Sequence, residues 1–198
     1  MAIDHHAYPQ PEDQGFSWTR SVRGARNRMQ PDRMSEFATN QLGDPYQLDN
    51  QGFPYHENSE HALEFLRKHK EGPFFLYYAT WLVHTPIHTR SRSLLEKYCK
   101  KLGVQPDLNA PETWSGTGQT NPFYCAMVEE LDYYIGKVLK YLNETEDPRW
   151  PGHTLSENTY IIVTSDNGGM EETPGEIITD NFPPVSYTHL TLPTRLLV

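Results

Sequence analysis

Residues 160–169 read Tyr-Ile-Ile-Val-Thr-Ser-Asp-Asn-Gly-Gly, a short apolar run that ends abruptly in polar residues and two glycines. A second apolar run, Pro-Phe-Phe-Leu-Tyr-Tyr-Ala, occupies residues 73–79 and has no polar alternation. Continuous apolar runs of this length are typical of strands that are covered on both faces, as in a parallel sheet. Both runs are therefore predicted to be buried strands.

A long helix is predicted between these two strands. Asn121-Pro122 is a favourable helix start, because an N-cap residue is followed by proline at the first helical position. Apolar or aromatic residues then recur every three or four positions and form one wide helical stripe. The stripe comprises Tyr124, Met127, Val128, Leu131, Tyr134, Ile135, Val138, Leu139 and Leu142. Asp132 lies near this stripe and is interpreted as a buried, hydrogen-bonded structural acid.

Two shorter helices are also expected. Asn58 or Ser59 is predicted to cap a helix that Gly72 stops, directly before the first strand. Residues 91–103 are predicted to form a short helix. The order strand, helix, strand indicates a βαβ unit, for which a right-handed parallel crossover is the strong default. The fold class is therefore α/β, with a mostly parallel sheet and flanking helices.

The ends of the two strands carry the candidate functional residues. In a parallel sheet both strands end at the same edge, and ligands of open α/β folds bind outside that edge. The loop that carries His84 follows the first strand, and the turn with Asp166 and Asn167 follows the second. We therefore expect these residues to lie at one edge of the sheet.

Asp166 and Asn167 offer a carboxylate and a neutral amide oxygen at adjacent positions, which are hard donors suited to Ca²⁺ or Mg²⁺. The alternative is an ordinary Asp-Asn-Gly turn, and these residues alone favour it. His84 has the chemistry of a general acid, an anion contact or a metal ligand. Its alternative is a polar loop histidine, which is plausible because the chain has nine histidines.

Composition excludes several classes of protein. The chain has 198 residues, with 17 Lys and Arg against 26 Asp and Glu, for a net charge of −9. A general nucleic-acid binder would show a basic footprint instead. No stretch approaches the roughly 20 apolar residues that a membrane span needs. The two cysteines are too few for a disulfide scaffold.

Four segments together resemble the sulfatases, the formylglycine-dependent, arylsulfatase-like sulfuric ester hydrolases of the alkaline-phosphatase-like superfamily. Residues 73–79 with His84-Thr-Pro look like the family's "PFFLYxxxxxxHxP" strand and loop. Residues 124–139 resemble its "YxAxVxxLDxxVGxVL" helix, and residues 158–169 its "NTxVxxTSDNGG" metal strand. Gln14-Gly15-Phe16 is similar to the "GF" that follows its "GKWHLG" motif.

The resemblance implies roles for three residues. Asp166 and Asn167 match a pair of Ca²⁺ ligands in the family, with Mg²⁺ the less favoured ion. His84 matches the histidine that contacts the sulfate ester oxygens. The superfamily's two-metal phosphatases and phosphodiesterases carry histidine at the position of Asn167, as suits zinc. An amide oxygen suits a single hard cation instead.

Some expected family features are missing from these 198 residues. No Cys or Ser lies in the "C/S-x-P-x-R" motif from which the family's formylglycine is made. In the family, a pair of aspartates upstream of these segments completes the metal site, and that pair is absent here. Residues 1–184 are therefore interpreted as part of a sulfatase catalytic domain whose N- and C-terminal parts are missing. Residues 185–198 look like a translated transposase adapter from sequencing libraries, and they are interpreted as a non-native read-through tail.

The resemblance implies a parent protein that hydrolyses sulfate monoesters, of a sulfated carbohydrate or an aryl alcohol, with a Ca²⁺-bound formylglycine nucleophile. The parent is expected to be exported to a periplasm, the extracellular space or a lysosome. Two alternatives stay open: a phosphatase, phosphodiesterase or phosphonate hydrolase of the same superfamily, and a non-catalytic module that binds calcium or sulfated glycans.

Overall fold

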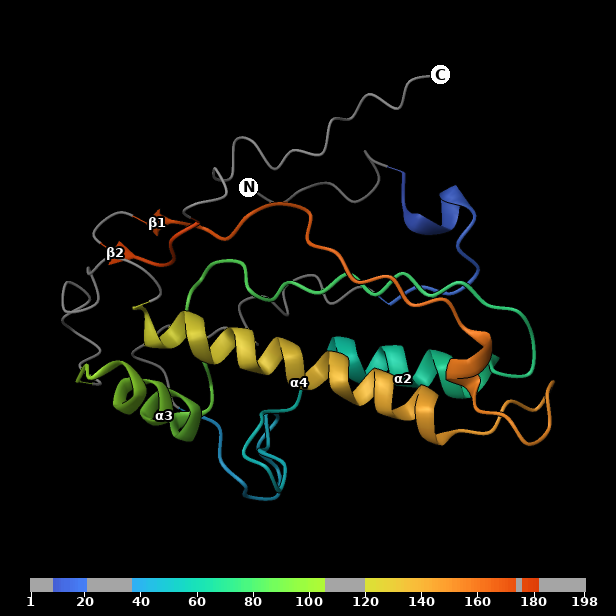
Figure 1. Cartoon of the computed structure of the whole chain (residues 1–198), viewed down its shortest axis with the longest axis horizontal. Helices are drawn as coiled ribbons and strands as arrows, with labels where there is room; N and C mark the ends of the chain where they lie inside the picture. The colour runs from blue at the N-terminus through green and yellow to red at the C-terminus, as the bar shows by residue number, and fades with distance from the viewer. Residues whose placement is uncertain (1–8, 21–36, 106–119, 174–175, 182–198) are drawn as a thin grey trace.

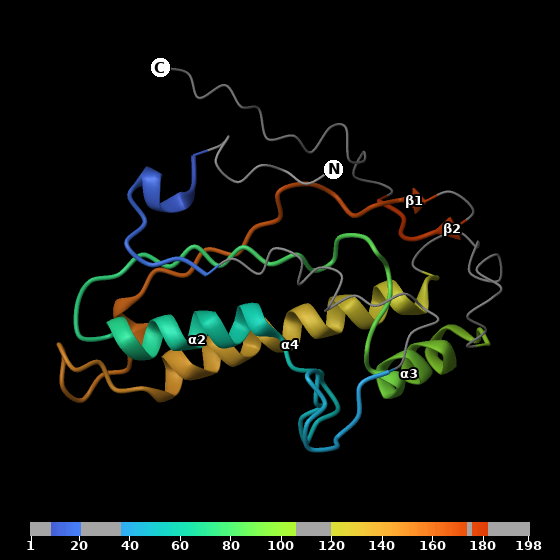
Figure 2. The same cartoon turned by 180° about the vertical axis from the view of Figure 1, so that it is seen from behind.

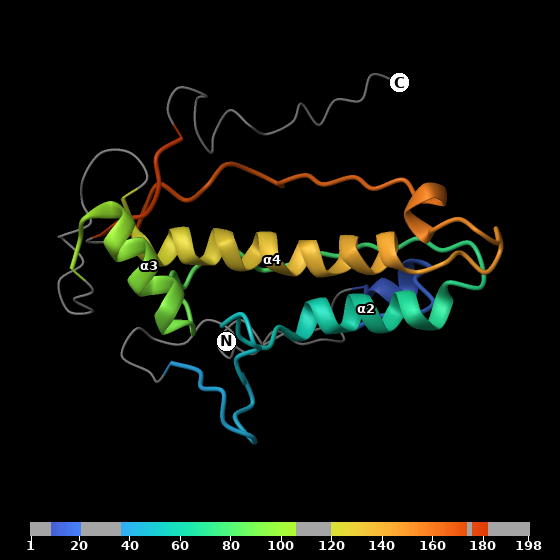
Figure 3. The same ribbon diagram turned by 60° about the horizontal axis from the view of Figure 1, so that its bottom comes forward.

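The computed structural model describes residues 9–20, 37–105, 120–173 and 176–181. Three α-helices dominate this part of the chain: α2 (Glu57–His69), α3 (Arg92–Leu102) and α4 (Pro122–Glu144). Two 3₁₀ turns, η1 (Pro11–Gln14) and η3 (Leu155–Asn158), and two short strands, β1 (Glu172–Thr173) and β2 (Glu176–Ile177), complete it. The views in Figures 1 and 3 place α3 near the start of α4 and α2 along its later half.

Helix α4 begins as predicted. The side chain of Asn121 accepts hydrogen bonds from the backbone N–H groups of Phe123 and Tyr124, at 3.0 and 3.1 Å. These bonds satisfy two amide donors that the first helical turn leaves unpaired. The face of α4 toward α2 and α3 is buried and includes Met127 and Val138.

The other side of α4 differs from the prediction. Val128 is 45% exposed, and Asp132 is exposed as well, so its interpretation as a buried acid is wrong. The sequence stripe is therefore wider than the buried face of α4.

Helix α2 is capped by a different residue from those predicted. The N-cap is His56, whose Nδ1 accepts a hydrogen bond from the backbone N–H of Ser59 at 3.2 Å. Ser59 lies inside the helix, and its hydroxyl donates to the carbonyl of His56 at 2.9 Å. Helix α3 follows the prediction, with Ser91 as N-cap and Gly103 in the left-handed region at φ 71°.

The two predicted strands are extended segments without a ladder partner among the described residues. Along residues 73–80 the side chains alternate between exposed and half-buried. Phe75 and Tyr77 are 73% and 72% exposed, whereas Phe74, Leu76 and Tyr78 pack against the helices. The segment is therefore covered on one face, and the prediction of cover on both faces is wrong for it.

The second segment is more exposed still. Tyr160 and Ile162 are 102% and 87% exposed, and Ile161 and Val163 are 47% and 68% exposed. In Figures 1 and 2 both segments run from the C-terminal end of α4 toward its N-terminal end, which is the relative direction that a βαβ unit requires. The ladder in the described part of the chain is the antiparallel pair β1–β2. The parallel sheet therefore stays a prediction.

Candidate active site at the start of helix α4

The two segments that follow the extended runs meet in one hydrophobic cluster. Its buried members include Ile87 from the first segment, Ile178 from beyond the second, and Phe123 and Met127 from the first turns of α4. Leu82, Val83 and Met170 pack against the same cluster. The first two turns of α4 are therefore the common base for the loop that carries His84 and the turn that carries Asp166 and Asn167.

His84 lies at the exposed end of its loop. Its backbone N–H donates to the carbonyl of Trp81 at 2.7 Å, and its ring meets the Trp81 ring edge-on with centroids 5.9 Å apart. The ring Nδ1 lies 3.1 Å from the carbonyl oxygen of Thr85, which only accepts, so a hydrogen bond there requires a proton on Nδ1. The Thr85 hydroxyl lies 3.1 Å from the same Nδ1 and can donate to it instead, which leaves the proton of neutral His84 on Nε2.

Asp166 and Asn167 form a local turn. The hydroxyl of Ser165 donates to the carbonyl oxygen of Asn167 at 2.5 Å. Asp166 is exposed and Asn167 is half-buried. The side chains of both residues make no hydrogen bond within the described ranges, so their oxygens are available to an external group.

Gly169 docks this turn against α4. A Cβ at this position would lie 2.7 Å from the hydroxyl oxygen of Tyr124 and 2.9 Å from Cγ2 of Thr179. A Cβ at these distances would force the ends of the Tyr124 and Thr179 side chains to shift. The amide of Asn181 adds a hydrogen bond to the carbonyl of Gly169 at 2.7 Å. The turn is thus tied to α4 from one side and to residues 179–181 from the other.

The residues present suit a calcium ion only in part. Asp166 and Asn167 provide a carboxylate and an amide oxygen, which are the donors that Ca²⁺ prefers, but Ca²⁺ takes six to eight oxygens. In the part of the chain that the structure describes, no group of three or more His, Cys, Asp or Glu residues is arranged to hold a metal. A calcium ion at this turn would therefore need further ligands from outside the described residues.

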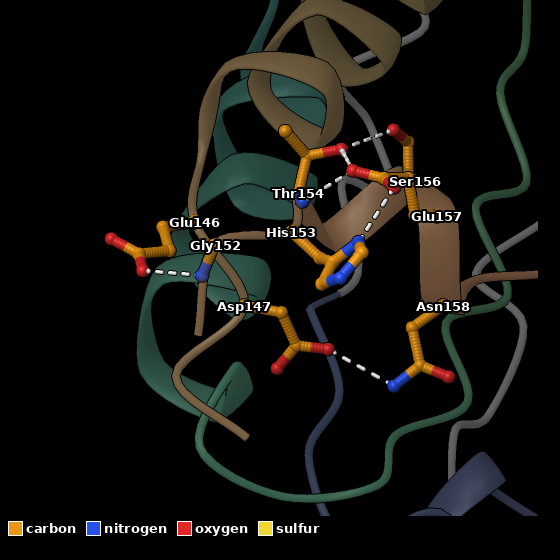
Figure 4. Close-up of polar contacts among 8 residues, drawn as sticks. All are labelled: Glu146, Asp147, Gly152, His153, Thr154, Ser156, Glu157 and Asn158. Carbon is orange, nitrogen blue, oxygen red and sulfur yellow. Dashed lines mark hydrogen bonds and ion pairs between the residues drawn. The ribbon is translucent and has the colours of Figure 1, made fainter. Parts of the chain in front are cut away.

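The other end of the second segment is held by a dense polar loop, shown in Figure 4. The carboxylate of Asp147 is fully buried and accepts from Arg149 Nε and Nη2, at 3.0 Å each, and from Asn158 Nδ2 at 3.0 Å. These hydrogen bonds, those from Arg149 first, hold the pKa of Asp147 well below its usual range. Asn158 ends η3 and lies two residues before the second segment, so this loop fixes the position at which the segment begins.

One buried acid near the site was missed in the sequence. Glu130 on α4 is 5% exposed and accepts a hydrogen bond from the hydroxyl of Thr89, which lies in the loop after His84. The burial of Glu130 could have been predicted from its spacing, because it stands three residues after Met127 and four before Tyr134, both on the buried stripe. Burial raises the pKa of this carboxyl to about 7, and the charge of Glu129 adds to the rise. The Thr89 hydrogen bond and Arg90 oppose it.

A second concave surface lies away from these residues. An open cavity of about 450 Å³ is lined by several aromatic side chains, among them Trp18, Phe65 and Phe74, and also by Lys68 and His69. Residues 73–75 begin the first extended segment, so this cavity is at the opposite end of that segment from His84. It has no part in the candidate site.

Comparison with known families gives a decisive match. The family model described as Sulfatase matches residues 5–188. This chain belongs to the Sulfatase family. The expected resemblance is confirmed, and membership implies the alkaline-phosphatase-like α/β fold.

Individual relatives carry the same description. Arylsulfatase H from Canis lupus familiaris is 30% identical over 117 residues, which are 59% of this chain and 16% of that protein. A sulfatase from Formosa agariphila is 36% identical over 107 residues, or 52% of this chain and 17% of that protein. An N-acetylgalactosamine-6-O-sulfatase from Bacteroides thetaiotaomicron is 30% identical over 107 residues, or 54% of this chain and 15% of that protein.

The matched part of the chain thus spans 15–17% of the length of each of these relatives. No solved structure matches the chain. None of the helices in the described ranges is long and apolar enough to cross a bilayer.

Proposed function

We propose that this chain is part of a sulfatase that hydrolyses sulfate monoesters, and that His84, Asp166 and Asn167 belong to its active site. Three relatives are named for sulfated substrates or for sulfatase activity in general, which supports sulfate ester hydrolysis. The observation that carries the assignment of the site is the shared hydrophobic cluster at the start of α4. It joins the loop after the first extended segment to the turn after the second.

The proposed roles follow from the chemistry of each side chain. Asp166 and Asn167 would hold a Ca²⁺ through their carboxylate and amide oxygens. A metal bound there would polarise the sulfate oxygens, and a formylglycine outside these 198 residues would supply the nucleophile. His84 is exposed, and when its Nδ1 accepts a hydrogen bond from the Thr85 hydroxyl, its Nε2 carries a proton and can donate. Its imidazole would contact the ester oxygens and stabilise the charge that develops on the leaving alcohol.

The test is an assay of the gene product that contains this chain with its flanking sequence. We expect turnover of 4-nitrophenyl sulfate and a fall of roughly 10²- to 10⁴-fold in kcat for His84→Ala, the range for loss of an acid–base residue. Asp166→Ala is expected to lower the activity and to raise the calcium concentration that the remaining activity requires. The matched control is Asp132→Ala, which replaces an exposed aspartate on α4 and should leave turnover unchanged.

The same assay separates the alternatives. A phosphatase or phosphodiesterase would turn over 4-nitrophenyl phosphate or its diester faster than the sulfate. A binding module would retain a sulfated glycan without turnover. The 198-residue polypeptide on its own is expected to be inactive, because it holds no "C/S-x-P-x-R" motif. Turnover by this polypeptide, lost in His84→Ala, would contradict the proposal that the nucleophile lies elsewhere.

A further inference from the structure

Residues 81–84 form a tight turn whose middle and ends lie in different surroundings. The backbone N–H of His84 donates to the carbonyl of Trp81 at 2.7 Å, the hydrogen bond that closes a four-residue β-turn. The two middle residues, Leu82 and Val83, pack against the hydrophobic cluster at the start of α4. The two end residues, Trp81 and His84, are exposed. The middle of the turn therefore fixes it to the core, and the two rings lie on its accessible side.

The two exposed rings contact each other. The ring centroids of Trp81 and His84 are 5.9 Å apart and the ring planes are 87° apart, which is an edge-to-face arrangement. In such a pair the partner covers at most one face of the indole. Trp81 is 42% exposed. An open, flat apolar surface therefore borders the imidazole that is proposed to act on the ester.

A half-exposed tryptophan is not evidence of a binding site by itself, because large apolar side chains are common on protein surfaces. Trp150 is a second example in this chain. It is 45% exposed and stacks on His153, with ring centroids 3.6 Å apart, but that loop lies at the other end of the second extended segment from Asp166. Trp81 differs because it contacts His84. A sulfate ester that reaches the imidazole of His84 brings its leaving group to the surface that Trp81 lines.

We propose that Trp81 is a substrate-contacting residue that favours sulfate esters whose leaving alcohol carries a flat ring, of an aryl group or of a sugar. This inference rests on the proposed function of the same site. The indole stacks on the apolar face of that ring, as aromatic side chains do in many ligand sites. The contact is the same in the bound substrate and in the transition state, so it strengthens binding without accelerating the chemical step.

Steady-state kinetics of the gene product that contains this chain with its flanking sequence tests the proposal. With 4-nitrophenyl sulfate, Trp81→Ala is expected to raise KM by roughly 10-fold and to leave kcat nearly unchanged, the signature of lost uniform binding. Trp81→Phe keeps a flat ring and should restore most of the affinity. Inorganic sulfate has no ring, so its inhibition constant should be the same in wild type and Trp81→Ala. The matched control is Trp150→Ala, which should leave KM and kcat unchanged.

The outcomes separate this inference from the proposed function. An unchanged KM in Trp81→Ala would overturn the inference alone. A fall in kcat without a rise in KM would also overturn it, because Trp81 would then only position His84. Absence of sulfate ester turnover in the wild-type gene product would overturn the proposed function, and this inference with it. A rise in KM for 4-nitrophenyl sulfate alone assigns the surface to aryl rings, and a rise for glucose 6-sulfate as well extends it to sugar rings.

Discussion

At the scale of single residues, His56 caps helix α2 and also makes the stability of the fold depend on pH. It is 4% exposed, its Nδ1 caps α2, and its ring stacks on Tyr134 with centroids 4.2 Å apart. Its Nε2 is buried and has no hydrogen-bond partner among the residues that the structure describes. Burial and then the charge of Lys137 lower the pKa of His56 to about 3. The folded chain therefore keeps this imidazole neutral.

Acidification is expected to destabilise the fold through His56. A base whose folded pKa is depressed contributes stability above its unfolded pKa of about 6.5 and loses it as the pH falls toward 3. At pH 5 the loss is about 2 kcal/mol in the free energy of unfolding. His56→Asn keeps an N-cap acceptor and does not titrate. Urea unfolding at pH 7.5 and 5 should show a smaller loss in this variant than in wild type, whereas the control His69→Gln should show the full loss.

At the scale of elements, the second extended segment has no strand partner among the described residues. Residues 158–165 carry no charge, and four consecutive residues, Tyr160 to Val163, are each at least 47% exposed. A row of free backbone donors and acceptors beside β-branched side chains is a template for pairing with another chain. In isolation this polypeptide is therefore expected to self-associate through that segment.

A charge placed on this edge should suppress the association. Ile162→Lys replaces a side chain that is 87% exposed, so it disturbs few native contacts. We expect light scattering to show fewer oligomers at the same protein concentration. Leu42→Lys is the control, because Leu42 is 96% exposed and lies outside both extended segments. If both variants lower the association equally, the cause is net charge or general hydrophobicity, and pairing through residues 160–164 is contradicted.

Across the whole molecule, the candidate site depends on contacts between segments that are far apart in the sequence. The turn after residue 164 contacts α4 at Tyr124. A Cβ at Gly169 would lie too close to Tyr124 and Thr179. Gly136, on the exposed side of the same helix, has open space around it. These two glycines provide a matched pair for measuring how tightly the turn is docked.

Alanine substitutions at these two glycines should change the free energy of unfolding in opposite directions. Gly169→Ala forces Tyr124 and Thr179 apart, and overpacking of this kind costs roughly 1–3 kcal/mol in the free energy of unfolding. Gly136→Ala improves an exposed helix interior by about 0.5–1 kcal/mol. Chemical denaturation of both variants checks the signs. A neutral or stabilising Gly169→Ala would mean that the turn is not held against α4.

The sequence by itself determined the features that depend on a few neighbouring residues. The starts of α3 and α4 follow from Ser91 and Asn121, because a cap acts within three positions. The family motifs, and with them the expected chemistry of His84, Asp166 and Asn167, are also local patterns. These three assignments stay predictions.

Only the tertiary structure decided which side chains are covered and which segments meet. Periodicity marks the apolar side of α4, but the placement of α2 and α3 decides that Val128 and Asp132 are exposed and Glu130 is buried. The apolar composition of residues 73–79 and 160–164 predicts extended chain, whereas hydrogen bonding between strands needs a partner from elsewhere. Burial and pairing arise between segments distant in the sequence, and no local pattern encodes them.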